Sequence, residues 1–436
     1  MAGFLGLDSM GRRLAQASLL RQEGRVTQSV GQVLEADLPG VSVGTLTEVA
    51  GVWAEVIGFQ EHKTLLMPLG SPERIAQGTP VRVLSRQLEV RVGDGLLGRV
   101  VDPLGNPLDG RPLEDVPFAC PLSAHAPDPL ARQRIDTPLP TGVRALDGLL
   151  TLGRGQRVCV MAGSGVGKST LLGMVARHAR ADINVIALIG ERGREVREFL
   201  ERDLGPEGLA RSVVVVATSD ASPILQVKGV FAAMSIAEHF RGQGKDVLML
   251  ADSLTRLAMA QRQIGLAAGE PPTTKGYTPS VFSLIPSLLE RAGPGAGRGS
   301  ITGVFTVLVE GDDIHDPVAD MVRGVVDGHI VLSRKLASHG HYPAIDVLQS
   351  LSRTMPHTTT LEQQAAAVRV RDLLATWHEN EELVRLGAYR KGTDPAVDRA
   401  ILLKPAIDAF LKQRVDEAEP FERVVAQLQR FTMAGA

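Results

Sequence analysis

The chain has 436 residues, of which 44% are hydrophobic and only 4% aromatic, and its formal net charge is -2. This length predicts two or three domains. The near-neutral charge argues against a broadly nucleic-acid-binding surface, and the few aromatic residues argue against stacking platforms for single strands. The two cysteines, Cys120 and Cys159, exclude a disulfide framework. With no signal peptide and no apolar run that could span a bilayer, we expect a cytosolic protein that meets membranes only through partners.

The first 95 residues divide into an arm and a small domain. Residues 1–23 form the N-terminal arm, in which 8–22 fit a short helix and a poorly ordered tail equally well. Short β-rich runs then follow between Gly, Pro and charged turns, at 27–34, 46–56, 63–66, 80–84 and 88–92. This even spacing predicts a β-barrel domain over residues 24–95.

The rest of the chain predicts an α/β domain followed by helices. After a turn-rich stretch at 98–110 and a proline-rich linker at 112–140, unbroken apolar runs of strand length alternate with helical segments; the runs are 157–161, 184–189, 212–217, 246–251, 302–310 and 328–332. This pattern is typical of a parallel sheet covered on both faces. We expect a nucleotide-binding domain over 96–360 and, where Leu, Ala, Glu and Arg predominate, a helical domain over 361–436.

Residues 162–169 read AGSGVGKS, a phosphate-binding loop pattern with Ala in the first place. Glycines let successive backbone N–H groups surround phosphate oxygens. Lys168 would meet the β- and γ-phosphates, and the Ser169 hydroxyl would bind Mg²⁺. A glycine-rich turn with a chance lysine is the alternative, which the strand before and the helix after disfavour. The predicted nucleotide-binding residues are Gly163, Ser164, Gly165, Val166, Gly167, Lys168, Ser169 and Thr170.

Two acidic residues follow neighbouring apolar strands. Asp252 ends one strand and could hold Mg²⁺ through water, although strands also end in Asp for turn or capping reasons. Glu191 follows another strand and could orient or deprotonate the attacking water, with Arg192 beside it as an electrostatic element. A charged, solvated turn is the alternative for Glu191.

Two further residues could complete a nucleotide site. Tyr342 lies in a proline-containing loop and could stack on adenine, although aromatic residues mostly pack in cores. Arg353 could reach the γ-phosphate of a neighbouring subunit. The alternative interpretation, favoured without further information, is that Arg353 is an ordinary surface or salt-bridged arginine. Nearby, His339 and His341 lack a third ligand at useful spacing and are interpreted as loop residues rather than metal ligands.

These motifs, in this order, resemble those of the type III secretion ATPases, relatives of the catalytic subunit of rotary ATP synthases. The likeness covers nearly everything after about residue 24, and its matching stretches are 140–147, 162–169, 190–195, 250–253, 269–277, 309–313 and 342–353. Residues 386–401 look more like the flagellar export ATPase than the injectisome one. The resemblance implies a RecA-like P-loop NTPase core with an N-terminal β-barrel and a C-terminal helical domain.

The resemblance also implies an activity and a set of partners. It implies hydrolysis of ATP, with Mg²⁺, to energise type III protein export, flagellar in preference to injectisome. It implies a homohexameric ring with sites between subunits, a stator-like regulatory protein at the N-terminal arm, a coiled-coil stalk, a membrane export gate, and export chaperones and substrates. The location would be cytoplasmic, peripheral to the export apparatus, with no nucleic-acid partner. The site residues it assigns are Lys168 and Ser169 for phosphates and Mg²⁺, Glu191 for water, Asp252 for the metal site, Tyr342 for adenine and Arg353 for the finger in trans.

Two alternatives stay open. An RNA-translocating hexameric helicase of the transcription terminator type shares the ring core but needs aromatic and basic RNA contacts in its N-terminal barrel. Residues 24–92 offer Trp53 and Phe59 without a clustered aromatic motif. A non-hydrolysing, nucleotide-bound ring subunit is the other, and Glu191 argues against it because such a subunit can dispense with a catalytic carboxylate.

Overall fold

The computed structural model describes residues 22–85, 87–309 and 316–433. The helix or tail expected at 8–22 and the motif at 309–313 therefore lie almost wholly outside the described residues. The described chain forms two compact units. One holds the residues up to Leu88 together with Leu266–Glu270, and the other holds the rest.

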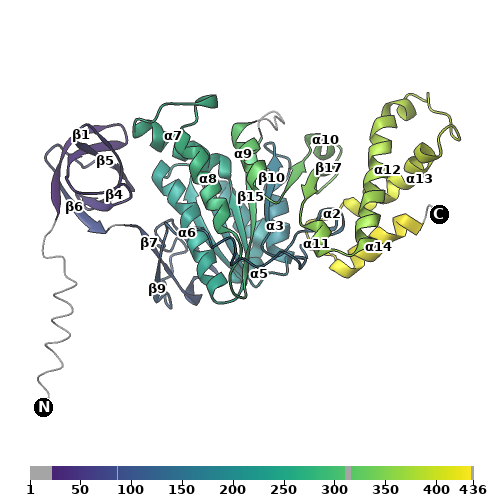
Figure 1. The fold of residues 1–436 in the computed structure, drawn as a ribbon, viewed down its shortest axis with the longest axis horizontal. Helices are drawn as coiled ribbons and strands as arrows, with labels where there is room; N and C mark the ends of the chain where they lie inside the picture. The colour runs from purple at the N-terminus through teal and green to yellow at the C-terminus, as the bar shows by residue number, and fades with distance from the viewer. Residues whose placement is uncertain (1–21, 86, 310–315, 434–436) are drawn as a thin grey trace, which may run out of the picture. The chain divides into compact units, whose positions relative to one another are not determined.

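The first unit is a closed barrel of six strands in the order β1-β2-β5-β4-β3-β6, all paired antiparallel (Figure 1). Its core contains the fully buried Leu34, Val49, Val56 and Leu66, because alternate residues of each strand point inward. The predicted barrel is confirmed. Its strands are β1 (Glu23–Val30), β2 (Val33–Asp37), β3 (Leu46–Val49), β4 (Val52–Gln60), β5 (Lys63–Pro68) and β6 (Pro80–Ser85).

Three of the predicted strand runs were wrong in detail. The runs 27–34 and 46–56 are hairpins rather than single strands. In the second, Ala50 and Gly51 have φ of 52° and 80°, and positive φ at both central residues is the turn geometry that matches strand twist. The run 88–92 does not join the barrel, because β7 (Glu89–Val92) pairs with β9 (Phe118–Pro121) in a separate two-stranded sheet.

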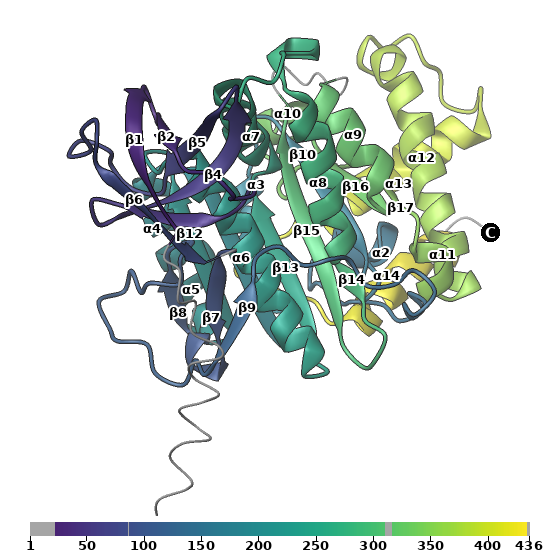
Figure 2. The same ribbon diagram turned by 60° about the vertical axis from the view of Figure 1, so that its left-hand side comes forward.

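The second unit is built on a nine-stranded sheet in the order β17-β16-β10-β15-β13-β11-β12-β8, with β14 paired to β15 (Figure 2). All neighbours are parallel except β17 on β16 and β14 on β15. The predicted parallel sheet is confirmed. Its strands are β8 (Arg99–Val101), β10 (Arg157–Ala162), β11 (Ile183–Glu191), β12 (Ser212–Thr218), β13 (Asp246–Asp252), β14 (Gly293–Pro294), β15 (Ser300–Leu308), β16 (Gly328–Leu332) and β17 (Ile345–Ser352).

Helices cover both faces of this sheet (Figures 1 and 2). Val160 and Leu250 share a buried cluster with helix α3, whereas the alternate residues Met161 and Ala251, also buried, point to the other face. Helix α6 packs along β11, β12 and β13. The helices are α2 (Arg144–Leu149), α3 (Lys168–His178), α4 (Gly193–Glu198), α5 (Gly205–Ala210), α6 (Pro223–Gly242), α7 (Leu254–Ala267), α8 (Pro279–Arg291), α9 (Pro317–Val325) and α10 (Arg334–Ser338), with short η1 (Asp94–Leu96), η2 (Phe199–Leu204) and η3 (Thr274–Gly276).

The chain ends in the predicted helical segment, formed by α11 (Met355–Thr358), α12 (Leu361–Arg385), α13 (Pro395–Leu411) and α14 (Phe421–Met433). These helices pack on one another and on α2, and their apolar faces join the same buried cluster as α3. The Thr360 and Asp394 side chains accept hydrogen bonds from first-turn N–H groups of α12 and α13 and so define where those helices begin. Among the described helices, none combines the length and apolar character needed to cross a membrane.

Candidate nucleotide-binding site

The phosphate-binding loop joins β10 to α3 at the centre of the sheet. Gly165 and Gly167 have φ of 77° and 98°, a left-handed conformation that strains residues with a Cβ. Ser164, Gly165 and Ser169 are exposed. Because α3 begins at Lys168, its unpaired first-turn N–H groups and the positive end of its dipole face this loop. The backbone is therefore arranged as an anion-binding terminus.

Lys168 lies between the two predicted carboxylates. Its Nζ makes an ion pair with Asp252 Oδ1 and lies 3.4 Å from Glu191 Oε1. Thr306 Oγ1 donates to Asp252 Oδ1 over 2.8 Å. Strand order explains the meeting, because β11, β13, β15 and β10 are successive neighbours in the sheet. The three predicted residues thus come together, and Thr306 joins them without having been predicted.

The environment of Glu191 favours its neutral form. Its carboxyl pKa is raised to about 7, chiefly because the group is buried. Lys168 opposes the rise, whereas the negative charge of Asp252 and a hydrogen bond that the protonated Glu191 carboxyl donates to Glu195 add to it. A carboxyl with a pKa near neutral pH can both accept and release a proton under physiological conditions, as a general base requires.

Arg256 of α7 is a second cation at this edge of the sheet. Gly190 has φ of 67°, and a Cβ there would lie 2.8 Å from Cβ of Arg256, so the arginine stem packs directly over the residue before Glu191. Its Nε has no hydrogen-bond partner within the described residues. Arg256 was not predicted; its signal in the sequence is its place four residues after Asp252, in the first turn of α7.

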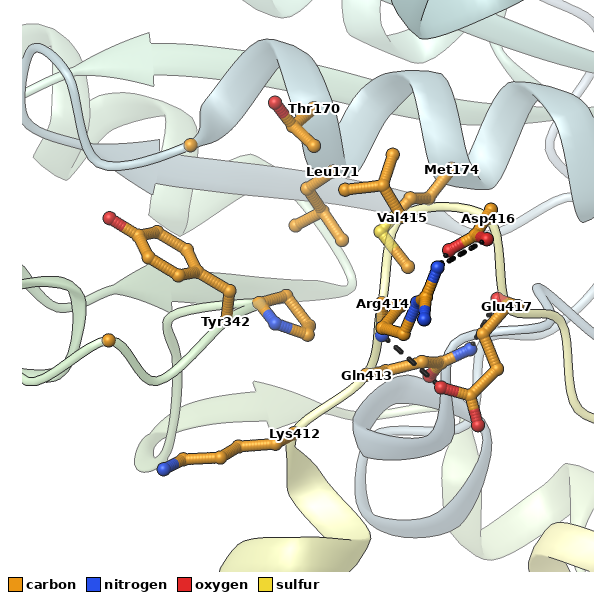
Figure 3. Close-up of a pocket in the computed structure, with 13 residues that line it drawn as sticks. Thr170, Leu171, Met174, Tyr342, Lys412, Gln413, Arg414, Val415, Asp416 and Glu417 are labelled. Carbon is orange, nitrogen blue, oxygen red and sulfur yellow. Dashed lines mark hydrogen bonds and ion pairs between the residues drawn. The ribbon is translucent and has the colours of Figure 1, made fainter.

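A cavity of about 690 Å³ opens beside α3 (Figure 3). The Tyr342 ring, 46% exposed, forms one wall and approaches the loop so closely that a Cβ on Gly167 would lie 3.6 Å from the ring. Thr170, which was among the predicted residues, lies in this cavity. The opposite wall was not predicted and is the segment after α13. Its residues are Lys412, Gln413, Arg414, Val415, Asp416 and Glu417.

The remaining two predicted residues lie outside this group. The Arg192 side chain is 76% exposed and pairs with Glu195 at 3.4 Å. Arg353 follows the far end of β17, whose register pairs Ile345 with Leu332 and Ser352 with Gly328. Leu332 lies beside Ala162 at the start of the phosphate loop. The backbone N–H of Arg353 bonds to Asp327, five residues before Leu332, so Arg353 is at the opposite edge of the sheet, roughly 16 Å away along the strand. Within one chain it cannot reach the nucleotide site.

Three family models match this chain. The nucleotide-binding domain of the ATP synthase alpha/beta family matches residues 142–352. The β-barrel domain of the same family matches 26–84, and the T3SS EscN ATPase C-terminal domain matches 359–430. Each matched range corresponds to one of the regions described above: the barrel, the sheet with its helices, and the C-terminal helices.

Individual proteins match almost end to end. The chain is 48% identical over 419 residues to the flagellum-specific ATP synthase of Bacillus subtilis (strain 168), covering 94% of this chain and 95% of that one. It is 50% identical over 427 residues to the type 3 secretion system ATPase of Xanthomonas euvesicatoria, covering 97% and 96%. The assembled ATPase EscN from the enteropathogenic E. coli type III secretion system superimposes with a TM-score of 0.90 at 45% identity, covering 94% of this chain and 99% of that chain. EscN in complex with its central stalk EscO gives 0.87 at 44% identity and the same coverage.

These matches confirm the predicted fold, the ATPase activity and the link to type III export. Relatives from flagellar and secretion systems match at nearly equal identity, so identity does not separate the two roles. The chain therefore belongs to the family of flagellum-specific and type III secretion ATPases.

Proposed function

We propose that this ATPase hydrolyses MgATP at sites shared between neighbouring copies of the chain in a homohexameric ring. The observation that carries the proposal is the split of the site residues. Lys168, Glu191 and Asp252 meet at one edge of the sheet, whereas Arg353 lies at the other. A site that needs both sets is completed only by a second copy, and head-to-tail contacts of this kind form a ring when the rotation from copy to copy closes.

Each part of the nucleotide has a proposed partner. The loop amides and Lys168 bind the phosphates, and the base stacks on Tyr342 in the cavity beside α3. Asp252 and Ser169 would hold Mg²⁺, since a carboxylate and a hydroxyl are oxygen ligands of the kind this ion prefers, and the ion would supply charge neutralisation at the phosphates. Arg192, at the first turn after Glu191, is proposed as an electrostatic element.

Glu191 is proposed to orient and deprotonate the attacking water. Lys168 currently lowers the pKa of this carboxyl by its positive charge. When Lys168 turns to phosphate oxygens, that opposing charge moves away and the proton affinity of Glu191 rises. In its ionised form, Glu191 would therefore be a stronger base toward the attacking water when phosphate is bound.

The ring proposal predicts that turnover depends on protein concentration. We expect the steady-state ATPase rate per subunit to rise as the chain is concentrated and rings form, and RNA to leave it unchanged. A coupled phosphate-release assay, run beside light scattering on the same samples, measures both. A rate per subunit that stays constant from the most dilute sample to the fully assembled one would refute shared sites.

Lys168→Ala is expected to weaken ATP binding about 10- to 100-fold, because it removes a charge-assisted hydrogen bond worth about 1.5–3 kcal/mol. Titration with a fluorescent ATP analogue measures this loss. Lys245→Ala, at an exposed lysine, is the matched control and should bind as the unmodified chain does. Equal affinities of the two variants for the ATP analogue would show that Lys168 does not bind the nucleotide.

The partners are proposed from the relatives. EscN has been solved with its central stalk EscO, and we propose a coiled-coil stalk for this chain as well. A stator-like regulator at the N-terminal arm, a membrane export gate, and export chaperones and substrates complete the proposed set. The corresponding location is cytoplasmic, at the membrane export apparatus.

A further inference from the structure

The wall of the cavity opposite Tyr342 is held by one buried amide. Gln413 is 6% exposed, and its Nε2 donates to the carbonyls of Gly142 at 2.7 Å and Glu417 at 2.8 Å. Its Oε1 accepts from Arg144 N at 2.8 Å. Its backbone N–H donates to the Tyr342 carbonyl at 2.9 Å. Both amide hydrogens and the amide oxygen are thus engaged within the protein (Figure 3 shows Gln413 on its loop).

Arg144 reinforces the same segment. Its guanidinium is buried and donates to the Phe410 carbonyl at 2.8 Å, to the Lys412 carbonyl and to the Glu417 carboxylate. These bonds satisfy carbonyls at the end of α13, which have no partner within the helix. Because such bonds are charge-assisted and buried, moving the 412–417 loop would cost several of them at once.

The other end of this connection reaches the phosphate-binding helix. Asp147 accepts from Thr141 N, Thr141 Oγ1 and Gly142 N at 2.8, 2.7 and 3.0 Å, which fixes the segment whose carbonyl receives Gln413. Gly142 has φ of 75°, and a Cβ there would lie 2.7 Å from Cβ of His178, the last residue of α3. Gln413 therefore joins the two walls of the cavity, the Tyr342 loop and the 412–417 segment, and ties them to Gly142, which packs against the end of α3.

We propose that Gln413 is a positioning residue that sets the affinity of the site for the nucleotide base. It holds Val415 and its neighbours at a fixed separation from the Tyr342 ring, and so fixes the width of the slot between them. Its own polar groups are all engaged within the protein, so it acts through the two walls. This inference rests on the proposed function, because it takes the Tyr342 cavity as the base subsite.

The test compares two substrates that differ only in the base. Gln413→Glu keeps the size of the side chain and the oxygen that accepts from Arg144 N. It replaces the amide nitrogen by an oxygen, which cannot donate to the carbonyls of Gly142 and Glu417 and repels them. We expect the KM for ATP to rise about tenfold with kcat within twofold, since ground-state and transition-state binding are lost equally. The KM for ribose 5-triphosphate, which lacks the base, should stay unchanged.

A matched control separates positioning from general destabilisation. Gln364 also donates two side-chain hydrogen bonds to backbone carbonyls, those of Pro356 and Thr359. Gln364→Glu should leave both KM values unchanged. An equal rise in KM for both triphosphates, or an ATP KM for Gln413→Glu that matches that of Gln364→Glu, would overturn the proposal.

A double-mutant cycle tests the route through Tyr342. In a Tyr342→Ala background the slot has lost one wall, so adding Gln413→Glu should raise the ATP KM less than twofold further. A full tenfold additional rise would show that Gln413 does not act through the Tyr342 wall.

Gln413→Met, which keeps volume without polar groups, repeats the test if the Glu variant does not fold. If the unmodified chain hydrolyses neither triphosphate, the proposed function itself fails, which is a distinct outcome.

Discussion

Glu191→Gln is expected to lower kcat for ATP hydrolysis by roughly 10²- to 10⁴-fold, the usual contribution of a positioned general base. The amide keeps the size of the side chain but cannot accept a proton from water. Nucleotide binding should persist, because the loop amides, Lys168 and Tyr342 are unchanged. Single-turnover hydrolysis and equilibrium binding of a fluorescent ATP analogue measure the two effects separately.

The matched control for this variant is Glu198→Gln. Glu198 lies on the same strand-to-helix segment, is 45% exposed and pairs with Arg194 at 2.6 Å, so its loss should leave hydrolysis unchanged. Full activity in Glu191→Gln, or an equal loss in both variants, would exclude Glu191 as the group that activates water.

The pH dependence gives an independent signature. A base must be ionised to act, and the pKa of Glu191 is raised to about 7. We therefore expect kcat/KM, which reports the free enzyme, to rise with pH up to about 7 and to fall tenfold per pH unit below it. The residual activity of Glu191→Gln should lack this acidic limb. A persistent limb would assign it to another group.

Much of the α/β core could be predicted from sequence because its signals are local. The strands at the centre of the sheet are continuous apolar runs, and the phosphate loop carries its own glycine pattern between a strand and a helix. The edge strands could not be predicted in this way. β17 has neither a continuous apolar run nor a regular alternation, because Leu348 and Gln349 are both exposed, and β8 has only three residues within a stretch rich in turn formers.

Only those residues of the site that lie in recognisable sequence motifs were predicted. Lys168, Glu191 and Asp252 follow apolar strands, so their meeting could be expected from a parallel sheet. Gln413 could not be found in this way, since its partner Gly142 is 271 positions away in the chain. Arg256 was missed for a related reason: its stem is placed by the absence of a side chain at Gly190, a contact that only the folded structure reveals.

Arg353→Ala is expected to lower turnover by roughly 10³- to 10⁵-fold while nucleotide binding persists, the range measured for arginine fingers. The cause is lost stabilisation of charge on the transferring phosphoryl group in the site of a neighbouring copy. The steady-state rate per subunit, compared at equal degrees of assembly, measures the effect. Unchanged turnover would make Arg353 an ordinary surface residue.

Mixing two inactive variants tests directly whether the finger acts in trans. In a ring made from equal amounts of Glu191→Gln and Arg353→Ala, some interfaces pair an intact Glu191 on one copy with an intact Arg353 on the next. Random assembly makes such interfaces about a quarter of the total. We therefore expect the mixture to regain up to about a quarter of normal turnover, although each variant alone stays inactive. If both residues served one site from the same chain, no mixture could restore hydrolysis, because every copy would carry one defect.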